Sequence, residues 1–148
     1  MIGIVIATHG KLSNGVIDAA ELIIGGTDDI QAINLVHGDD VTKLQEKLTV
    51  SINKVNDDDG VIIFTDLAGA SPYNQATLAV RSLSESIQKK VFVITGVNLP
   101  MLLEAINQQM IDASVEEAVD AIVNTAKQSV LVWSQSDEAD DSEEEEEF

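Results

Sequence analysis

The chain has 148 residues, of which 45% are hydrophobic, and a formal net charge of −18, which suits a single soluble domain with one core. It contains no cysteine, which excludes disulfides, thiolate metal sites and a cysteine nucleophile and is consistent with a cytoplasmic protein. The negative charge argues against binding to nucleic acid or to an anionic membrane, so basic proteins and neutral solutes are better partners.

Four apolar runs rich in β-branched residues predict strands. These runs span residues 2–7, 30–36, 61–65 and 91–95. The first, third and fourth are apolar at nearly every position, which is typical of strands buried on both faces of a parallel sheet. The first run has no basic segment before it and stops at Thr8, so it is too short for a signal peptide or a membrane span.

Helical periodicity fills the intervals between these runs and continues beyond the last one. We expect Asp39 or Asp40 to cap the second helix, and Ser71, which is followed by Pro72, to cap the third. Ser114 begins a capping-box pattern at the last helix. The expected helices span residues 13–24, 41–55, 71–83, 100–109 and 114–128.

The alternation of strands and helices predicts an α/β fold. Right-handed crossovers would give an open, mostly parallel sheet with helices on both faces. In the common strand order 2-1-3-4, the first and third strands are neighbours where the order reverses, and ligands bind beyond the carboxyl ends of the strands at that point. We therefore expect a site where residues 8–10 and residues 65–72 meet.

His9 and Asp66 follow directly on the first and third predicted strands, so this topology places them opposite each other. Neutral imidazole is a good nucleophile near pH 7. A carboxylate on Nδ1–H would fix the tautomer, leave the Nε2 lone pair free to attack and stabilise a positively charged phosphoimidazole. The pair therefore predicts a histidine that takes up a phosphoryl group and passes it on.

Small and hydroxyl-bearing residues around this pair are candidates for holding the phosphate. Backbone N–H groups can approach an anion closely at Gly10, Gly69 and Ala70, and the helix that starts near Ser71 adds donors and a favourable dipole. The hydroxyls of Thr8 and Ser71 could add hydrogen bonds. Alternatively, Gly69 and Ala70 form only a turn. We expect neither a metal site nor a cofactor.

Plainer interpretations exist for each of these residues. His9 could be a surface or capping residue at a strand end, and Asp66 could simply cap the loop that follows. We interpret His37 as a loop residue and Trp133 as a packing residue. Residues 57–60 lack the ligand spacing and glutamate of an EF-hand, which favours a solvated turn. No glycine-rich nucleotide motif is present.

The motifs at these strand ends strongly resemble the mannose family of enzyme IIA components in the bacterial phosphoenolpyruvate-dependent sugar phosphotransferase system. The resemblance covers residues 1 to about 133. It rests on an early Thr8-His9-Gly10, on Asp66 followed by an Ala-Ser-Pro-Tyr-Asn motif, and on a Gly-Val-Asn-Leu-Pro-Met motif at residues 96–101.

This resemblance implies a function that spacing alone does not show. The histidine matching His9 is phosphorylated at Nε2 by the phosphocarrier HPr and passes the phosphoryl group to a histidine of enzyme IIB, which serves the membrane IIC/IID permease. Asp66 and Ser71 match the family's active-site aspartate and serine. The transported sugar is not readable, because enzyme IIA never touches it.

The resemblance also implies a homodimer in which a C-terminal strand is exchanged between subunits, and residues 130–133 match that strand. The best-known member of the family continues through a linker into a IIB domain. Here nine of the residues 137–148 are acidic and none is basic. We therefore expect an enzyme IIA domain over residues 1–133, a disordered acidic tail over residues 134–148, and enzyme IIB as a separate chain.

Two alternatives remain open. The first is the IIA-like phosphocarrier of the dihydroxyacetone kinase system, which shares the fold and an early histidine but is not expected to carry the motif at residues 70–74. The second is a non-catalytic regulatory domain that binds a partner through the same face.

Overall fold

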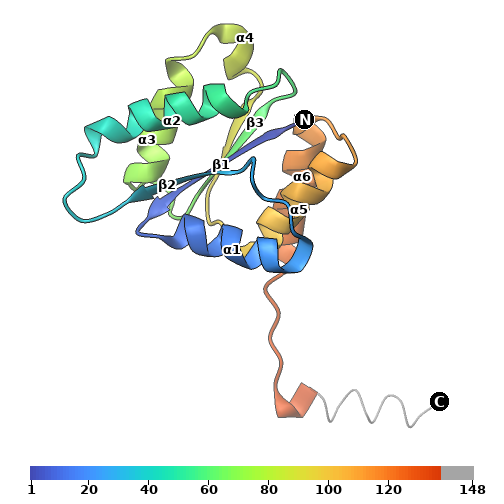
Figure 1. Cartoon of the computed structure of the whole chain (residues 1–148). Coiled ribbons are helices and arrows are strands. Elements are labelled where there is room, and N and C mark those ends of the chain that lie inside the picture. The colour runs from blue at the N-terminus through green and yellow to red at the C-terminus, as the bar shows by residue number, and fades with distance from the viewer. Residues whose placement is uncertain (138–148) are drawn as a thin grey trace.

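A single parallel sheet with the strand order β2-β1-β3-β4 forms the centre of the computed structural model, which describes residues 1–137 (Figure 1). All three strand pairs are parallel, which confirms the predicted order and class of sheet. The strands are β1 (Gly3–His9), β2 (Gln31–Leu35), β3 (Val61–Thr65) and β4 (Val91–Ile94). The helices are α1 (Leu12–Ile24), α2 (Thr42–Val55), α3 (Ser71–Arg81), α4 (Glu85–Gln88), α5 (Leu99–Met110) and α6 (Val115–Gln128).

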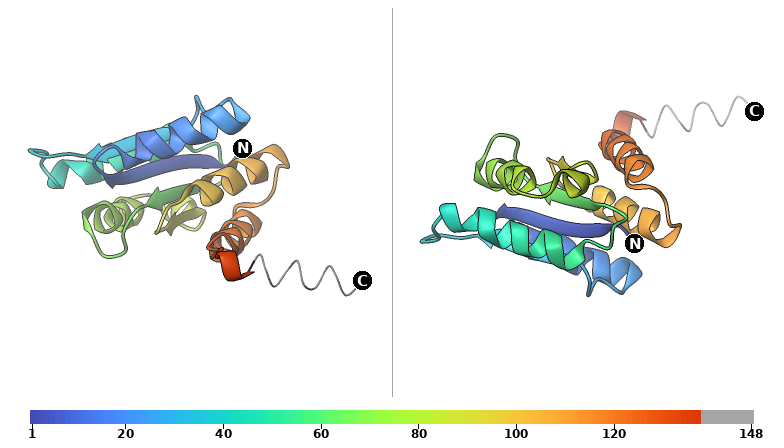
Figure 2. Two further views of the ribbon diagram at one scale, coloured as in Figure 1. Left: turned by 90° about the horizontal axis from the view of Figure 1, so that it is seen from below. Right: turned by 90° about the horizontal axis from the view of Figure 1, so that it is seen from above.

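Helices cover both faces of the sheet, as expected. Alternate side chains of a strand point to opposite faces, so each fully apolar strand contributes to two hydrophobic clusters. Ile6 and Phe64 pack with α1, α5 and α6 on one face, whereas Val5 and Ile63 pack with α2 and α3 on the other. In Figure 2, β1 lies in the centre of the molecule with helices on either side.

The starts of two helices differ from the sequence prediction. Ala70, in an extended conformation with φ −88° and ψ 175°, is the N-cap of α3, and Ser71 is its first helical residue. The prediction that Ser71 caps this helix is therefore wrong by one position, which Pro72 permits because proline is tolerated throughout the first turn. Asn98 caps α5, since its Oδ1 accepts the backbone N–H of Met101 at 3.0 Å.

The other predicted caps lie close to where they were expected. Val41 occupies the N-cap position of α2, but Asp40 Oδ1 accepts the backbone N–H of Thr42 at 2.9 Å and so satisfies the first donor of the helix. The capping box of α6 is present, with the side chains of Ser114 and Glu117 each accepting the other's backbone N–H. Helix α4 was not predicted, because four residues are too few to show periodicity.

Residues 130–133 leave the end of α6 and run away from the sheet (Figure 1). Within residues 1–137 they belong to no strand, and these residues are 67–87% exposed. Trp133 is thus not packed in the single chain, contrary to the sequence interpretation. An exchange of this segment needs a second chain, and most of the predicted acidic tail, residues 138–148, lies outside the described residues. None of the helices described is long and apolar enough to cross a membrane.

Candidate active site

His9 and Asp66 meet at the carboxyl edge of the sheet. β1 and β3 are neighbours in parallel register, with Ala7 opposite Thr65, so the residues that follow them lie side by side. His9 Nδ1 lies 2.9 Å from Asp66 Oδ2, and the backbone N–H of His9 donates to the same oxygen at 3.0 Å. The strand order inferred from the sequence therefore places the two side chains correctly.

The two members of this pair differ in exposure. The His9 side chain is 47% exposed, whereas the Asp66 side chain is 15% exposed. With the proton on Nδ1 shared with Asp66, the Nε2 lone pair of His9 is free, and no group among residues 1–137 is hydrogen-bonded to it. The arrangement thus presents an oriented imidazole nitrogen to solvent and keeps its carboxylate partner largely below the surface.

Burial and hydrogen bonding act in opposite directions on the pKa of Asp66. Partial burial by itself raises this pKa, but the hydrogen bonds from the His9 ring and from the His9 backbone outweigh that effect and hold it below its ordinary value. The carboxylate is therefore ionised at neutral pH.

Two of the residues expected to hold phosphate have other partners. The hydroxyl of Thr8 is buried and accepts the backbone N–H of Ser13 at 2.9 Å, which anchors the start of α1 to the sheet. The backbone N–H of Gly10 donates to the carbonyl of Leu35 at 2.7 Å, which ties the end of β1 to β2. Both residues thus support the scaffold under His9, and no sequence motif indicates these partners.

Gly69, Ala70 and Ser71 form the turn that leads from Asp66 into α3. Gly69 has a φ of +76°, a conformation that side chains disfavour, and its carbonyl accepts the Nδ2–H of Asn74 at 3.0 Å. This turn directs the N-terminus of α3 to the same edge of the sheet as His9. Helix N-termini carry free N–H groups and a partial positive charge, so the turn remains suited to an anion.

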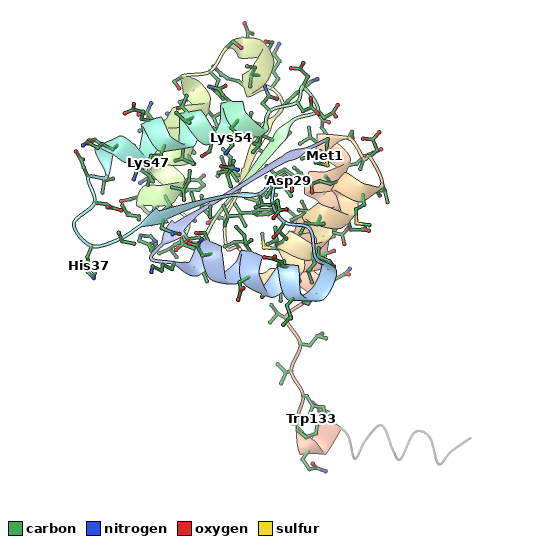
Figure 3. The ribbon with its side chains drawn as sticks, viewed as in Figure 1. Met1, Asp29, His37, Lys47, Lys54 and Trp133 are labelled. Atoms are coloured by element: carbon green, nitrogen blue, oxygen red, sulfur yellow. The ribbon has the colours of Figure 1, made fainter. Side chains whose placement is uncertain are left out.

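His37 shares a pocket with His9, although the sequence interpretation set it aside. Figure 3 shows it on the loop that follows β2. The pocket has a volume of about 510 Å³ and is lined by His9, Gly10, Leu35, Val36, His37, Gly38, Asp39 and Val41. The adjacency of β1 and β2 explains this, because parallel neighbours end at the same edge. Residues 1–137 contain no cluster of three or more metal-ligating side chains.

The chain is similar to known proteins over most of its length. Residues 3–123 match the family model described as the PTS system fructose IIA component (EIIA-man). The chain is 33% identical over 130 residues to the PTS system mannose-specific EIIAB component of Escherichia coli, which covers 87% of this chain but only 38% of that protein. It is 26% identical over 107 residues to the PTS system fructose-specific EIIA component of Bacillus subtilis, covering 72% and 70% of the two chains.

A solved structure shares the fold. The phosphotransferase system component EIIA from Streptococcus agalactiae superposes with a TM-score of 0.78 at 27% identity, over 89% of this chain and 97% of that one.

Proposed function

Since the chain belongs to the mannose-type enzyme IIA family of the sugar phosphotransferase system, we propose that it is a phosphocarrier with His9 as its phosphorylation site. Phospho-HPr would be the donor and a separate enzyme IIB the acceptor. The mannose- and fructose-specific names of its relatives favour a sugar-system carrier over the carrier of the dihydroxyacetone kinase system. The observation that carries the proposal is the 2.9 Å contact between His9 Nδ1 and Asp66 Oδ2 beneath an exposed ring.

The chemistry is a transfer of one phosphoryl group between two imidazoles. The Nε2 lone pair of His9 attacks the phosphorus of the donor's phosphohistidine, and a new N–P bond forms as the old one breaks. The donor imidazole leaves with the electron pair of the broken bond. His9 keeps its Nδ1 proton, so its ring becomes positively charged and the carboxylate of Asp66 stabilises it. Transfer to enzyme IIB reverses these steps toward a different imidazole.

The turn before α3 is proposed to hold the phosphoryl oxygens. Free N–H groups in the first turn of α3 and the hydroxyl of Ser71 lie beyond the end of β3, at the same edge as His9. Gly69 and Ala70 keep this approach open because they present little or no side chain. Thr8 and Gly10 would act through the scaffold, by fixing the start of α1 and the end of β1.

The active form is proposed to be a homodimer that exchanges residues 130–133. Four consecutive apolar side chains, Val130 to Trp133, are exposed in the single chain, which is unfavourable unless another surface covers them. Truncation after Ser129 should therefore convert a dimer into monomer or aggregate in sedimentation experiments. A stable, monodisperse dimer after truncation would contradict the exchange.

The test of the function is a mass measurement after incubation with phosphoenolpyruvate, enzyme I and HPr. The expected result is the gain of one acid-labile phosphoryl group, which then disappears on addition of a cognate enzyme IIB. A regulatory domain that only binds would form a complex with HPr but show no change in mass, and that outcome would overturn the proposal.

A further inference from the structure

Three buried side-chain oxygens at one corner of the sheet lack a hydrogen-bond partner within residues 1–137. They are Asp66 Oδ1, Thr65 Oγ1 and Thr95 Oγ1, and in this part of the chain no other buried side-chain nitrogen or oxygen is unpaired. All three lie at the carboxyl ends of β3 and β4. Buried polar groups in folded proteins are nearly always paired, with protein or with ordered water. Three such atoms at the ends of two neighbouring strands point to a common partner.

The register of the sheet sets the two threonines next to each other. Phe64 is paired with Ile94 in the parallel ladder between β3 and β4, so Thr65 and Thr95 occupy the next position on neighbouring strands. Neighbouring strands lie about 4.8 Å apart. Thr65 directly precedes Asp66, so both hydroxyls come from the edge of the sheet that carries this carboxylate.

Both threonines also face the same side of the sheet. Ile63 and Val93, two positions earlier, pack in the cluster beneath α2 and α3, and residues two apart in a strand share a face. The backbone N–H of Val97 donates to the carbonyl of Thr65 at 3.0 Å, so the loop after β4 closes over the end of β3. The two hydroxyls are therefore buried at the ends of β3, which leads into Asp66, and of the neighbouring β4.

We infer that Thr65 and Thr95 hold a buried water molecule against the second oxygen of Asp66 and thereby act as positioning residues for His9. A buried water typically makes about three hydrogen bonds, which matches two hydroxyls and one carboxylate oxygen. The water donates to Asp66 Oδ1 and to one threonine, and it accepts from the other. This inference rests on the proposed phosphocarrier function.

Such an anchor fixes the rotation of the carboxylate. Oδ2 of Asp66 accepts two hydrogen bonds from His9, but these alone leave the other oxygen unsupported. With Oδ1 held as well, the carboxylate keeps its orientation toward Nδ1 while the ring gains and loses a phosphoryl group. The proton then remains on Nδ1, and the lone pair remains on Nε2.

Isosteric removal of the hydroxyls tests the inference. Thr65→Val and Thr95→Val should each slow phosphoryl uptake from phospho-HPr on the order of tenfold. Losses of this size are usual when a residue that orients a metal ligand through a hydrogen bond is removed, and Asp66 would depend on the threonines in the same way. Nitrogen NMR of the imidazole, recorded on the unphosphorylated chain, should show a smaller share of His9 rings with the proton on Nδ1. Serine at the same positions should restore both properties. Thr49→Val is the matched control, because that hydroxyl bonds within its own helix.

The double variant separates a shared water from two independent effects. If both hydroxyls hold one water, Thr65→Val combined with Thr95→Val should be no slower than the slower single variant. Additive losses would contradict the inference. So would valine variants that resist heat better than the parent and keep its tautomer and transfer rate, because the hydroxyls would then be truly unpaired. A parent chain that takes up no phosphoryl group would instead overturn the proposed function, and the tautomer measurement would still test the threonines.

Discussion

Each end of the sheet holds a nitrogen against a carboxylate, but in different surroundings. At the carboxyl end, His9 Nδ1 lies 2.9 Å from Asp66, whose side chain is 15% exposed. At the amino end, the α-amino group of Met1 binds Asp57 and Asp59, whose side chains are 79% and 55% exposed. Figure 3 shows Met1 at the opposite end of the sheet from the loop that carries His37.

The difference shows what burial of a carboxylate adds to an ion pair. Exposed charges are screened by water and salt and hold no fixed geometry, so such pairs contribute little. Asp66 Oδ2 accepts hydrogen bonds from the ring and from the backbone of the same residue, His9, so this pair is tied to the end of β1. Residues 57–59 are exposed and include a bend, which agrees with the solvated turn expected from the sequence, although Asp57 and Asp59 also pair with the Met1 amine.

The largest expected effect at the carboxyl end is the loss of the nucleophile. His9→Ala should abolish acid-labile phosphate incorporation from phospho-HPr, because no other imidazole lies beside a buried carboxylate among residues 1–137. His37→Ala is the control and should still be phosphorylated. Incorporation that survives in the His9 variant, or stops in the His37 variant, would show that the wrong histidine has been chosen.

Removal of the charge from Asp66 should have the next largest effect. Asp66→Asn should keep the fold and slow transfer on the order of 10²-fold or more, if the carboxylate acts as those of catalytic triads do. Rapid-quench measurement in both directions, from phospho-HPr and back to HPr, provides the rates. Equal rates for variant and parent in both directions would leave Asp66 as a structural residue only.

The same substitution should alter stability in a pH-dependent way. The pKa of Asp66 is lower in the folded chain than in the unfolded chain, where it is about 3.9. The ionised carboxylate therefore stabilises the fold at pH values above the unfolded-state pKa, and this stabilisation is lost as the pH falls through the folded-state pKa. At pH 7 the free energy of unfolding of the parent should exceed that of Asp66→Asn by about 1 kcal/mol, a value already reduced because the His9 ring is half exposed to solvent. Urea unfolding at several pH values should show this gap closing in acid. A gap that persists in acid would assign it to packing.

The smallest effect is expected at the amino end. The Met1 amine holds the pKa of Asp59 below its ordinary value, and the pKa of that amine is raised in return. Both groups are exposed, so Asp59→Asn should leave the unfolding midpoint unchanged within error at 0.15 M salt, a typical physiological ionic strength. A loss of stability as large as that of Asp66→Asn would remove the distinction between the two ends.

The fold was predictable because its signals are local and strong. Runs of apolar residues predict the four strands, and their alternation with helices predicts a parallel sheet. The common strand order of such a sheet brings His9 to Asp66. The hydrogen-bond partners of Thr8 and Gly10 were not predictable, because they depend on how closely α1 and β2 approach the end of β1. The pocket beside His37 likewise depends on which strands are neighbours and not on any motif.

Both hydrogen bonds from His9 end on a single oxygen of Asp66, which has a consequence for reversible phosphoryl transfer. Through Asp66, the imidazole is tied to its own backbone N–H, and neither hydrogen bond involves Nε2, the nitrogen proposed to carry the phosphoryl group. On the proposed function, loading and unloading of His9 would therefore require little reorganisation of these two hydrogen bonds. In a carrier of this kind, the direction of phosphoryl transfer would depend on the relative concentrations of the phosphorylated donor and the unphosphorylated acceptor.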